Sequence, residues 1–176
     1  MQTPEANQNV RYGPAKWGEP TSPGTFGRLP YLTTLENVDF VVAGIPFDNL
    51  TTYRSGTRFG PKAIREAYGT GEYNVEMGVN IFEHLSGVDY GNFKIANGDA
   101  AKTFSTITEE MKKILDAGVL PVILGGDHSI TYPELLAYRD VVGPVSLIHF
   151  DSHTDTWGSD EDQTYIRPSQ RNLPVH

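Results

Sequence analysis

Three short runs of apolar residues, many of them β-branched, constrain the fold of this chain more than any other feature. They lie at residues 38–45, 119–124 and 145–150, and a weaker candidate at 86–90 lies between the first two. Continuous apolar runs of this length are typical of strands that are buried on both faces of a parallel sheet. We therefore predict a strand at each of these positions.

Segments with helical signals alternate with these runs. Pro61 stands at a favourable first position for a helix over residues 62–68. The clearest helix is predicted over residues 100–117, where apolar side chains recur at helical spacing and Gly118 provides a stop. A third helix is predicted from about residue 133 to 142. Strands that alternate with helices predict an α/β fold with a mainly parallel sheet.

The first 30 residues are predicted to form an irregular N-terminal arm. Residues 1–30 contain five prolines and four glycines, which prevent a long helix or strand. Two interpretations stay open. The arm is a loose tail, or it packs on its own domain or on a neighbouring subunit through aromatic and apolar anchors, namely Tyr12, Trp17, Phe26 and Leu29.

Charge and composition exclude several classes of protein. The chain has 14 basic and 22 acidic residues, a net charge of −8 and no cysteine. The acidic balance argues against a general nucleic-acid-binding protein and mildly favours a small cationic ligand. The lack of cysteine excludes disulfides and Cys-ligated zinc. No apolar run reaches the roughly 18 residues of a membrane span, and residues 1–12 lack a secretory signal. We therefore expect a cytoplasmic protein with neither a nucleic-acid nor a membrane partner.

Two polar motifs follow predicted strands and contain the residues best suited to chemistry. Gly125-Gly126-Asp127-His128-Ser129 follows the second apolar run, and Asp151-Ser152-His153-Thr154-Asp155 follows the third. Functional groups of parallel α/β sheets collect at the carboxyl ends of the strands, so the two motifs are expected to meet. If the chain stays extended past Phe150, the side chains of Asp151, His153 and Asp155 point to the same side.

This pattern predicts a metal site. Two carboxylates and an imidazole suit Mn, Fe or Zn, and His128 would add a second imidazole. The two glycines before His128 allow the backbone to turn sharply. We expect Asp127 to hold an imidazole or to brace its loop.

Other interpretations of the same residues are weaker. A His–Asp pair could transfer protons to a serine nucleophile, Ser129 or Ser152, but neither serine lies in a G-x-S-x-G elbow. His149 is expected to be a core histidine or to support the site from behind. His84 has no partner in the pattern and is expected at the surface.

Together these segments resemble the ureohydrolases, the arginase and agmatinase superfamily. GGDHS at 125–129 and FDSHTDT at 150–156 resemble the first two metal motifs of that superfamily. Residues 44–67 resemble the segment that opens agmatinases and guanidino-acid hydrolases, residues 25–30 their N-terminal region, and residues 88–91 their short Asp-Gly strand. The resemblance implies a three-layer α/β/α arginase-like fold with a mainly parallel sheet, incomplete at its C-terminus. Residues 31–176 would then be the N-terminal part of a single ureohydrolase domain.

The resemblance also implies a binuclear manganese centre and a reaction. His128 and Asp155 would bind one Mn²⁺ ion, His153 the other, and Asp151 would bridge both. The implied reaction is agmatinase-like hydrolysis of the guanidinium group of agmatine or of a guanidino acid to urea and an amine. Asp155 or a neighbouring carboxylate would orient the attacking hydroxide, and His176 would assist proton transfer. A small cationic guanidino substrate and, for the full domain, a homo-oligomer are expected.

The sequence departs from the superfamily after the second motif. The third metal motif, an Asp-x-Asp on a later strand, is not found, and Asp160-x-Asp162 has no apolar strand before it. A truncated product, an incomplete copy of a longer chain and a shortened relative without catalysis all remain open. The alternative function is therefore a non-catalytic binding or regulatory protein. Half of a parallel sheet is also expected to leave an unpaired strand edge and uncovered apolar faces.

Overall fold

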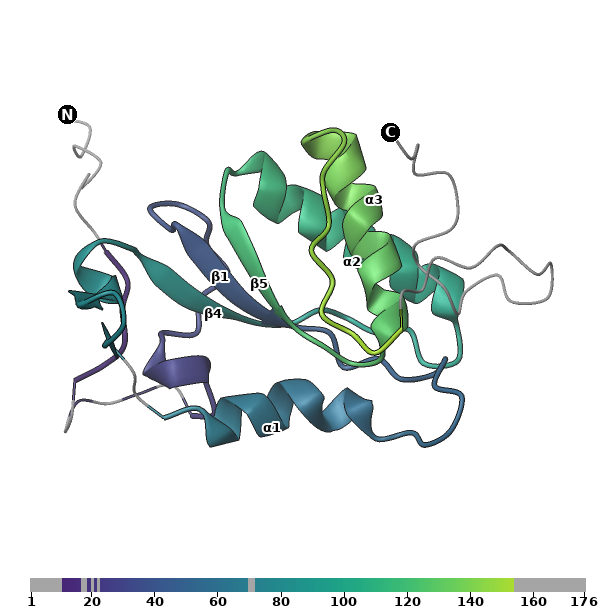
Figure 1. Cartoon of the computed structure of the whole chain (residues 1–176), viewed down its shortest axis with the longest axis horizontal. Coiled ribbons are helices and arrows are strands. Elements are labelled where there is room, and N and C mark those ends of the chain that lie inside the picture. The colour runs from purple at the N-terminus through teal and green to yellow at the C-terminus, as the bar shows by residue number, and fades with distance from the viewer. Residues whose placement is uncertain (1–10, 17–18, 20, 22, 70–71, 154–176) are drawn as a thin grey trace, which may run out of the picture.

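A three-stranded parallel sheet lies at the centre of the protein (Figure 1). The computed structural model describes residues 11–16, 19, 21, 23–69 and 72–153. The strands are β1 (Phe40–Gly44), β4 (Gly87–Asn92) and β5 (Leu120–Leu124), in the order β4-β1-β5. β1 pairs in parallel with both neighbours, so β4 and β5 form the two edges of the described sheet. Three of the four predicted strands are thus confirmed.

The three predicted helices are present, within about two residues of their predicted bounds. They are α1 (Gly60–Ala67), α2 (Ala100–Asp116) and α3 (Thr131–Val141). α2 begins where the Asp99 side chain accepts a hydrogen bond of 2.8 Å from the Lys102 backbone N–H, which satisfies one free donor of the first turn. It ends before Gly118, whose positive φ of 71° is readily adopted by glycine.

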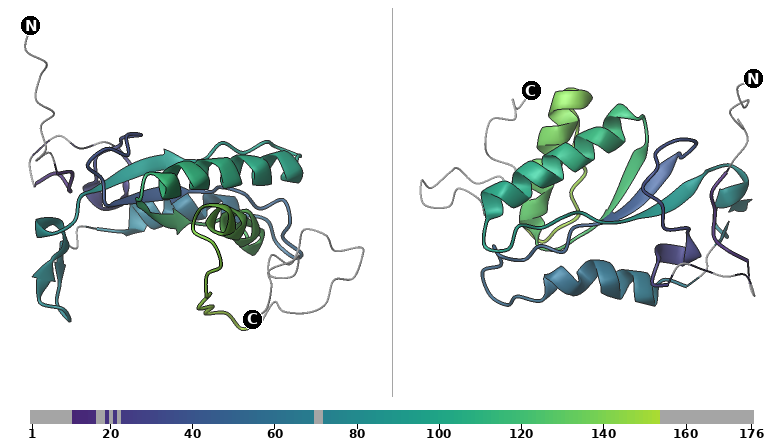
Figure 2. Two further views of the ribbon diagram at one scale, coloured as in Figure 1. Left: turned by 90° about the horizontal axis from the view of Figure 1, so that it is seen from above. Right: turned by 180° about the vertical axis from the view of Figure 1, so that it is seen from behind.

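Short elements complete the described chain. Two-residue strands β2 (Tyr73–Asn74) and β3 (Val79–Asn80) form an antiparallel hairpin. This hairpin lies at the end of the molecule away from α2 and α3, which lie side by side (Figure 2). Four 3₁₀ turns connect the longer elements: η1 (Phe26–Arg28), η2 (Thr57–Phe59), η3 (Ile81–Glu83) and η4 (His128–Ile130). No helix in these described segments is both long and apolar enough to cross a membrane.

Helices cover both faces of the sheet and give the expected three layers. Side chains alternate along β1, so Val41 and Ala43 pack into the main core with the apolar face of α2. Val42 points to the opposite face, where it packs with Leu29 and Leu124. α1 lies on that second face, because a Cβ on Gly44 would come within 2.8 Å of Pro61.

The segment predicted as a further buried strand, residues 145–150, is not a strand. It runs as a coil past α3 (Figure 1), and Ile148 and Phe150 are 81% and 95% exposed. An apolar pattern favours burial, but a strand must also pair its backbone groups with a neighbour, and this segment does not pair with the edge strand β5. The prediction of burial on both faces also fails for β5, an edge strand that leaves Leu120 61% exposed. The expected uncovered apolar surface is therefore present.

The described part of the N-terminal arm packs on its own domain. The Tyr12 backbone N–H donates to Ser86 Oγ at 2.8 Å, and the Gly87 backbone N–H donates to the Tyr12 carbonyl at 2.8 Å. The Phe26 ring stacks on Tyr68 at 4.1 Å between centroids. Trp17 lies outside the described residues, and the division of the chain at residue 30 stays a prediction.

Candidate metal centre

The loop that carries His128 is fixed against the segment that follows β1. The Gly126 backbone N–H donates to the Ile45 carbonyl at 3.2 Å, and the Asp127 backbone N–H donates to the Phe47 carbonyl at 2.7 Å. A Cβ on Gly126 would lie 2.2 Å from the Phe47 carbonyl oxygen, so only glycine allows this close approach. The loop therefore holds His128 at the carboxyl end of the sheet, as expected.

Asp127 braces this loop, which is one of the two roles predicted for it. Its Oδ1 accepts hydrogen bonds from the backbone N–H and the hydroxyl of Ser129. Its Oδ2 accepts from the Leu50 backbone N–H at 3.1 Å, which ties the loop after β5 to the loop after β1. The buried Ser129 hydroxyl is thus directed at a carboxylate, an arrangement that supports the loop.

The two predicted motifs meet around the carboxylate of Asp151. His128 Nδ1 lies 3.3 Å from Asp151 Oδ2, and His153 Nδ1 lies 3.5 Å from Asp151 Oδ1. The structure therefore brings together His128, Asp151 and His153. The other two predicted site residues, Asp155 and His176, lie outside the described residues, and all five roles stay predictions.

His149 lies in the same cluster, in agreement with the second of its two expected roles, support of the site. Its Nε2 lies 3.4 Å from Asp151 Oδ2, and its ring meets that of His128 edge-on at 4.9 Å between centroids. It is not a core histidine, since the residue is exposed. The signal was available, because residue 149 precedes Asp151 by two positions and extends the alternation of Asp151 and His153 backwards. His84, by contrast, is at the surface as expected.

Asp151 is ionised at neutral pH and suits a cation. The His153 backbone N–H donates to its Oδ1 at 3.0 Å, and this bond, aided by His149 and opposed by desolvation, lowers the pKa of Asp151 to about 2. One carboxylate among imidazole nitrogens is a donor set that fits Mn, Fe or Zn. His128, His149 and Asp151 each offer a ligand atom, and these atoms lie within 4.8 Å of one another.

An open pocket of about 500 Å³ adjoins the cluster. One wall is the loop of residues 50–57, and the other comes from residues 126–129 with Asp151 and His153. A pocket of this size suits a small molecule. The cluster therefore lies where a bound metal could face a small ligand.

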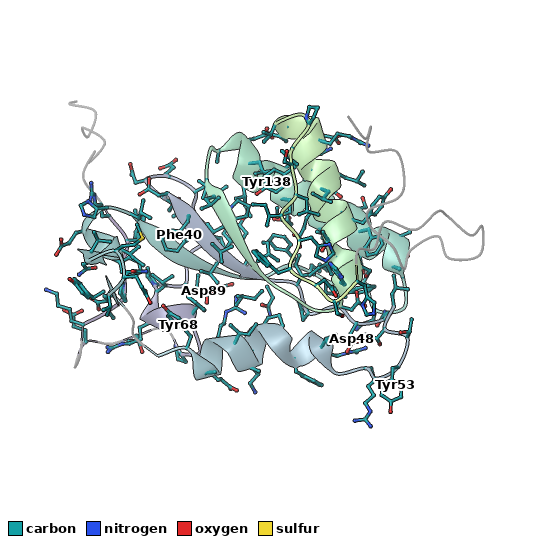
Figure 3. All side chains as sticks on the ribbon, in the orientation of Figure 1. Phe40, Asp48, Tyr53, Tyr68, Asp89 and Tyr138 are labelled. Carbon is teal, nitrogen blue, oxygen red and sulfur yellow. The ribbon has the colours of Figure 1, made fainter. Side chains whose placement is uncertain are left out.

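Asp48 shapes the first wall, and sequence reasoning missed this role too. Its Oδ2 accepts from the Gly56 backbone N–H at 2.6 Å, and its Oδ1 pairs with the Arg58 guanidinium. The Arg58 side chain is the main reason why the pKa of Asp48 is lowered to about 2. Figure 3 places Asp48 and Tyr53 on this loop, which precedes α1. An Asp three residues after the strand predicted at residues 38–45 is the only signal that the sequence offered.

Comparisons with known proteins agree on one family. A model of the arginase family matches residues 38–169. The chain is 42% identical over 130 residues to the mitochondrial agmatinase of Gallus gallus, covering 73% of this chain and 38% of the relative. It is 38% identical over 156 residues to the mitochondrial guanidino acid hydrolase of Homo sapiens, covering 88% of this chain and 44% of the relative.

Solved structures give the same result. A hypothetical agmatinase from Burkholderia thailandensis superposes with a TM-score of 0.78 at 34% identity, covering 93% of this chain and 52% of the other. The chain thus spans about half the length of that structure, and about two fifths of the curated relatives. The match to the arginase family, over residues 38–169, includes both motifs.

Proposed function

The chain belongs to the arginase family, and from this premise we propose that it is the N-terminal part of a metal-dependent, agmatinase-like amidinohydrolase. The proposed reaction is hydrolysis of the guanidinium group of agmatine or of a guanidino acid to urea and an amine. The observation that carries this proposal is the convergence of His128, Asp151 and His153 beside an open pocket. The named activities of the relatives give no support to the alternative of a non-catalytic binding protein.

The donor set fits the manganese that the proposal requires. A guanidinium carbon is a poor electrophile, and bound Mn²⁺ would supply a metal-activated water at neutral pH. His128, Asp151 and His153 would hold the metal, and Asp155 would complete this part of the site. Within this proposal Asp155 also orients the nucleophile and His176 assists proton transfer. Two ions bridged by Asp151 are proposed for the complete site.

Charge and pocket size support a small cationic substrate. The pocket of about 500 Å³ has room for a small molecule, and the whole chain carries a net charge of −8. A net negative charge favours a cationic ligand such as a guanidinium compound. Relatives named as an agmatinase and as a guanidino acid hydrolase leave two substrate classes, of which we favour agmatine because the loop at residues 53–56 resembles agmatinases. The relatives include mitochondrial and bacterial proteins, so the cytoplasmic location stays a prediction. The homo-oligomer also stays a prediction.

The test is a chimera in which this chain replaces the matching first half of the Burkholderia thailandensis agmatinase. We expect Mn²⁺-dependent urea release from agmatine or 4-guanidinobutanoate, and at least a 100-fold loss in the Asp151→Ala variant. Glu109→Gln, an exposed change on α2, is the matched control and should keep the activity. A folded chimera that binds Mn²⁺ but releases urea from neither substrate would contradict the proposed function.

A further inference from the structure

We propose that Arg54 binds the distal carboxylate of a guanidino acid and so sets how well this class of substrate is used relative to agmatine. The inference rests on the proposed function and deepens it, because it assigns a residue to the part of the substrate that does not react. It concerns the ratio between two substrate classes, so it holds whichever class is turned over faster.

Arg54 lies on the wall of the pocket opposite the cluster. Tyr53 and Arg54 line one side of the pocket, and His128, Asp151 and His153 line the other. Both residues of the first wall are exposed although they line the pocket, with 84% of Tyr53 accessible, so they lie at its rim. A substrate whose guanidinium group lies at the cluster would direct its other end towards this rim.

The turn that carries Arg54 is held on both sides by Asp48. The Thr51 hydroxyl donates to the Asp48 carbonyl at 3.0 Å, and the Gly56 backbone N–H donates to Asp48 Oδ2 at 2.6 Å. Gly56 also has a φ of 139°, a backbone conformation that favours glycine. Arg54 is therefore presented from an anchored turn, which reduces the entropy that is lost when a ligand binds.

The guanidinium group of Arg54 pairs with no carboxylate among the described residues. Arg58, Arg65 and Arg139 each pair with an aspartate. The Arg54 guanidinium carbon instead lies 5.0 Å from the centroid of the Tyr53 ring, and its Nη2 lies 3.3 Å from the Tyr53 hydroxyl. An arginine has five N–H donors and can bind a carboxylate through two parallel hydrogen bonds, so this cation at the rim suits a carboxylate ligand.

This cation distinguishes substrates by the charge of their tails. A carboxylate tail gains a charge-assisted hydrogen bond, the ammonium tail of agmatine is repelled, and an uncharged tail experiences neither effect. The competing interpretation is that Arg54 is a solvated surface cation with no part in ligand binding. Only the first interpretation predicts that the effect of substituting Arg54 depends on the charge of the tail.

The experiment compares three substrates in the chimera described above, namely 4-guanidinobutanoate, agmatine and butylguanidine, whose tail is uncharged. We expect Arg54→Gln to lower kcat/KM for 4-guanidinobutanoate by about 10-fold, to raise it for agmatine by about 2-fold and to leave it unchanged for butylguanidine. Arg54→Lys keeps the positive charge and should recover part of the loss. Arg139→Gln makes the same change at an exposed arginine outside the pocket lining and should alter none of the three values.

A second readout needs no turnover and uses the purified 176-residue chain. The NMR signal of the Arg54 Nε–H group should shift as 4-guanidinobutanoate is added, because a carboxylate changes the surroundings of this donor. Butylguanidine should shift the same signal much less. Equal shifts with the two compounds would contradict a contact between Arg54 and the carboxylate.

Two kinetic outcomes overturn the inference and differ in what they leave standing. An active chimera in which Arg54→Gln keeps the wild-type ratio of kcat/KM for 4-guanidinobutanoate and agmatine would remove Arg54 from substrate recognition and leave the proposed function intact. A folded chimera that binds Mn²⁺ but releases urea from none of the three compounds would overturn the proposed function, and the role of Arg54 with it.

Discussion

At the scale of single residues, the site depends on carboxylates that fix loops as much as on those that face the pocket. Asp127 and Asp48 each satisfy backbone donors of a loop that lines the pocket. Asp127 was expected from its place beside His128. Asp48 could not be predicted, because its partners Gly56 and Arg58 lie eight and ten residues away and only the folded loop brings them to it.

Removal of the Asp48 carboxylate is expected to loosen the pocket loop. Asp48→Ala should lower the free energy of unfolding by about 2 kcal/mol at pH 7, because it leaves the Gly56 and Arg58 donors unpaired. Hydrogen exchange should become faster at the Gly56 amide. Asp116→Ala, an exposed change at the end of α2, is the control. Unchanged exchange at Gly56 would contradict the role assigned to Asp48.

The pairing of Asp48 with Arg58 also determines how the stability of the fold changes at acidic pH. The pKa of Asp48 is lowered in the fold from 3.8 to about 2, so the folded state prefers the ionised carboxylate. Its contribution to stability is present above about pH 4 and is lost as the pH falls towards 2. Wild-type protein should therefore lose stability over this range relative to Asp48→Ala, as measured by chemical denaturation.

At the scale of elements, α3 contains a half-buried carboxyl, that of Glu134, with no visible role in the site. Glu134 Oε1 has no hydrogen-bond partner in the described structure, and burial raises the pKa of this carboxyl to about 8. The folded state therefore prefers the protonated form. The stability of the fold that depends on this group is complete below about pH 4.5 and decreases as the pH rises towards 8.

Replacement of the Glu134 carboxyl by an amide tests this decrease of stability with rising pH. Glu134→Gln should stabilise the protein by about 2 kcal/mol at pH 8.5 and by much less at pH 5, because the variant has no carboxyl to ionise. Denaturation curves at the two pH values give the difference. The exposed Glu109→Gln control should shift little at either value. Equal effects of Glu134→Gln at both pH values would rule out the buried ionisation.

Elements differ in how far the sequence predicts them. α2 was predicted closely, because helical periodicity and the glycine at 118 act within the segment itself. The segment at residues 145–150 was predicted wrongly as a strand, because strand formation depends on a partner that lies elsewhere in the chain. For His149 the sequence left two roles open, because its place in an apolar run indicated a core position and its place before Asp151 indicated support of the site.

At the scale of the whole molecule, the edge strand β5 of the described sheet carries exposed apolar side chains. Leu120 and Val122 on β5 are 61% and 40% exposed, and apolar side chains of segment 145–150 are exposed as well. The family and the parallel fold could be predicted from local motifs. The completion of the site could not, because the third metal motif is not found in these 176 residues.

This surface predicts self-association of the 176-residue chain. Sedimentation should show concentration-dependent oligomers, and the double variant Leu120→Lys and Val122→Lys should reduce them, because charges on an edge strand oppose pairing between chains. Val75→Lys changes an apolar residue that is 79% exposed elsewhere, and it should have little effect. Association that is unchanged in the double variant would show that another surface is responsible.

The central claim is that two distant loops share a metal through one carboxylate, and Mn²⁺ binding to Asp151→Ala tests it most directly. Calorimetric titration of the folded chain should show that Asp151→Ala weakens Mn²⁺ binding by at least 100-fold, while Asp116→Ala binds Mn²⁺ like the wild type. Wild-type affinity and stoichiometry in Asp151→Ala would contradict the claim.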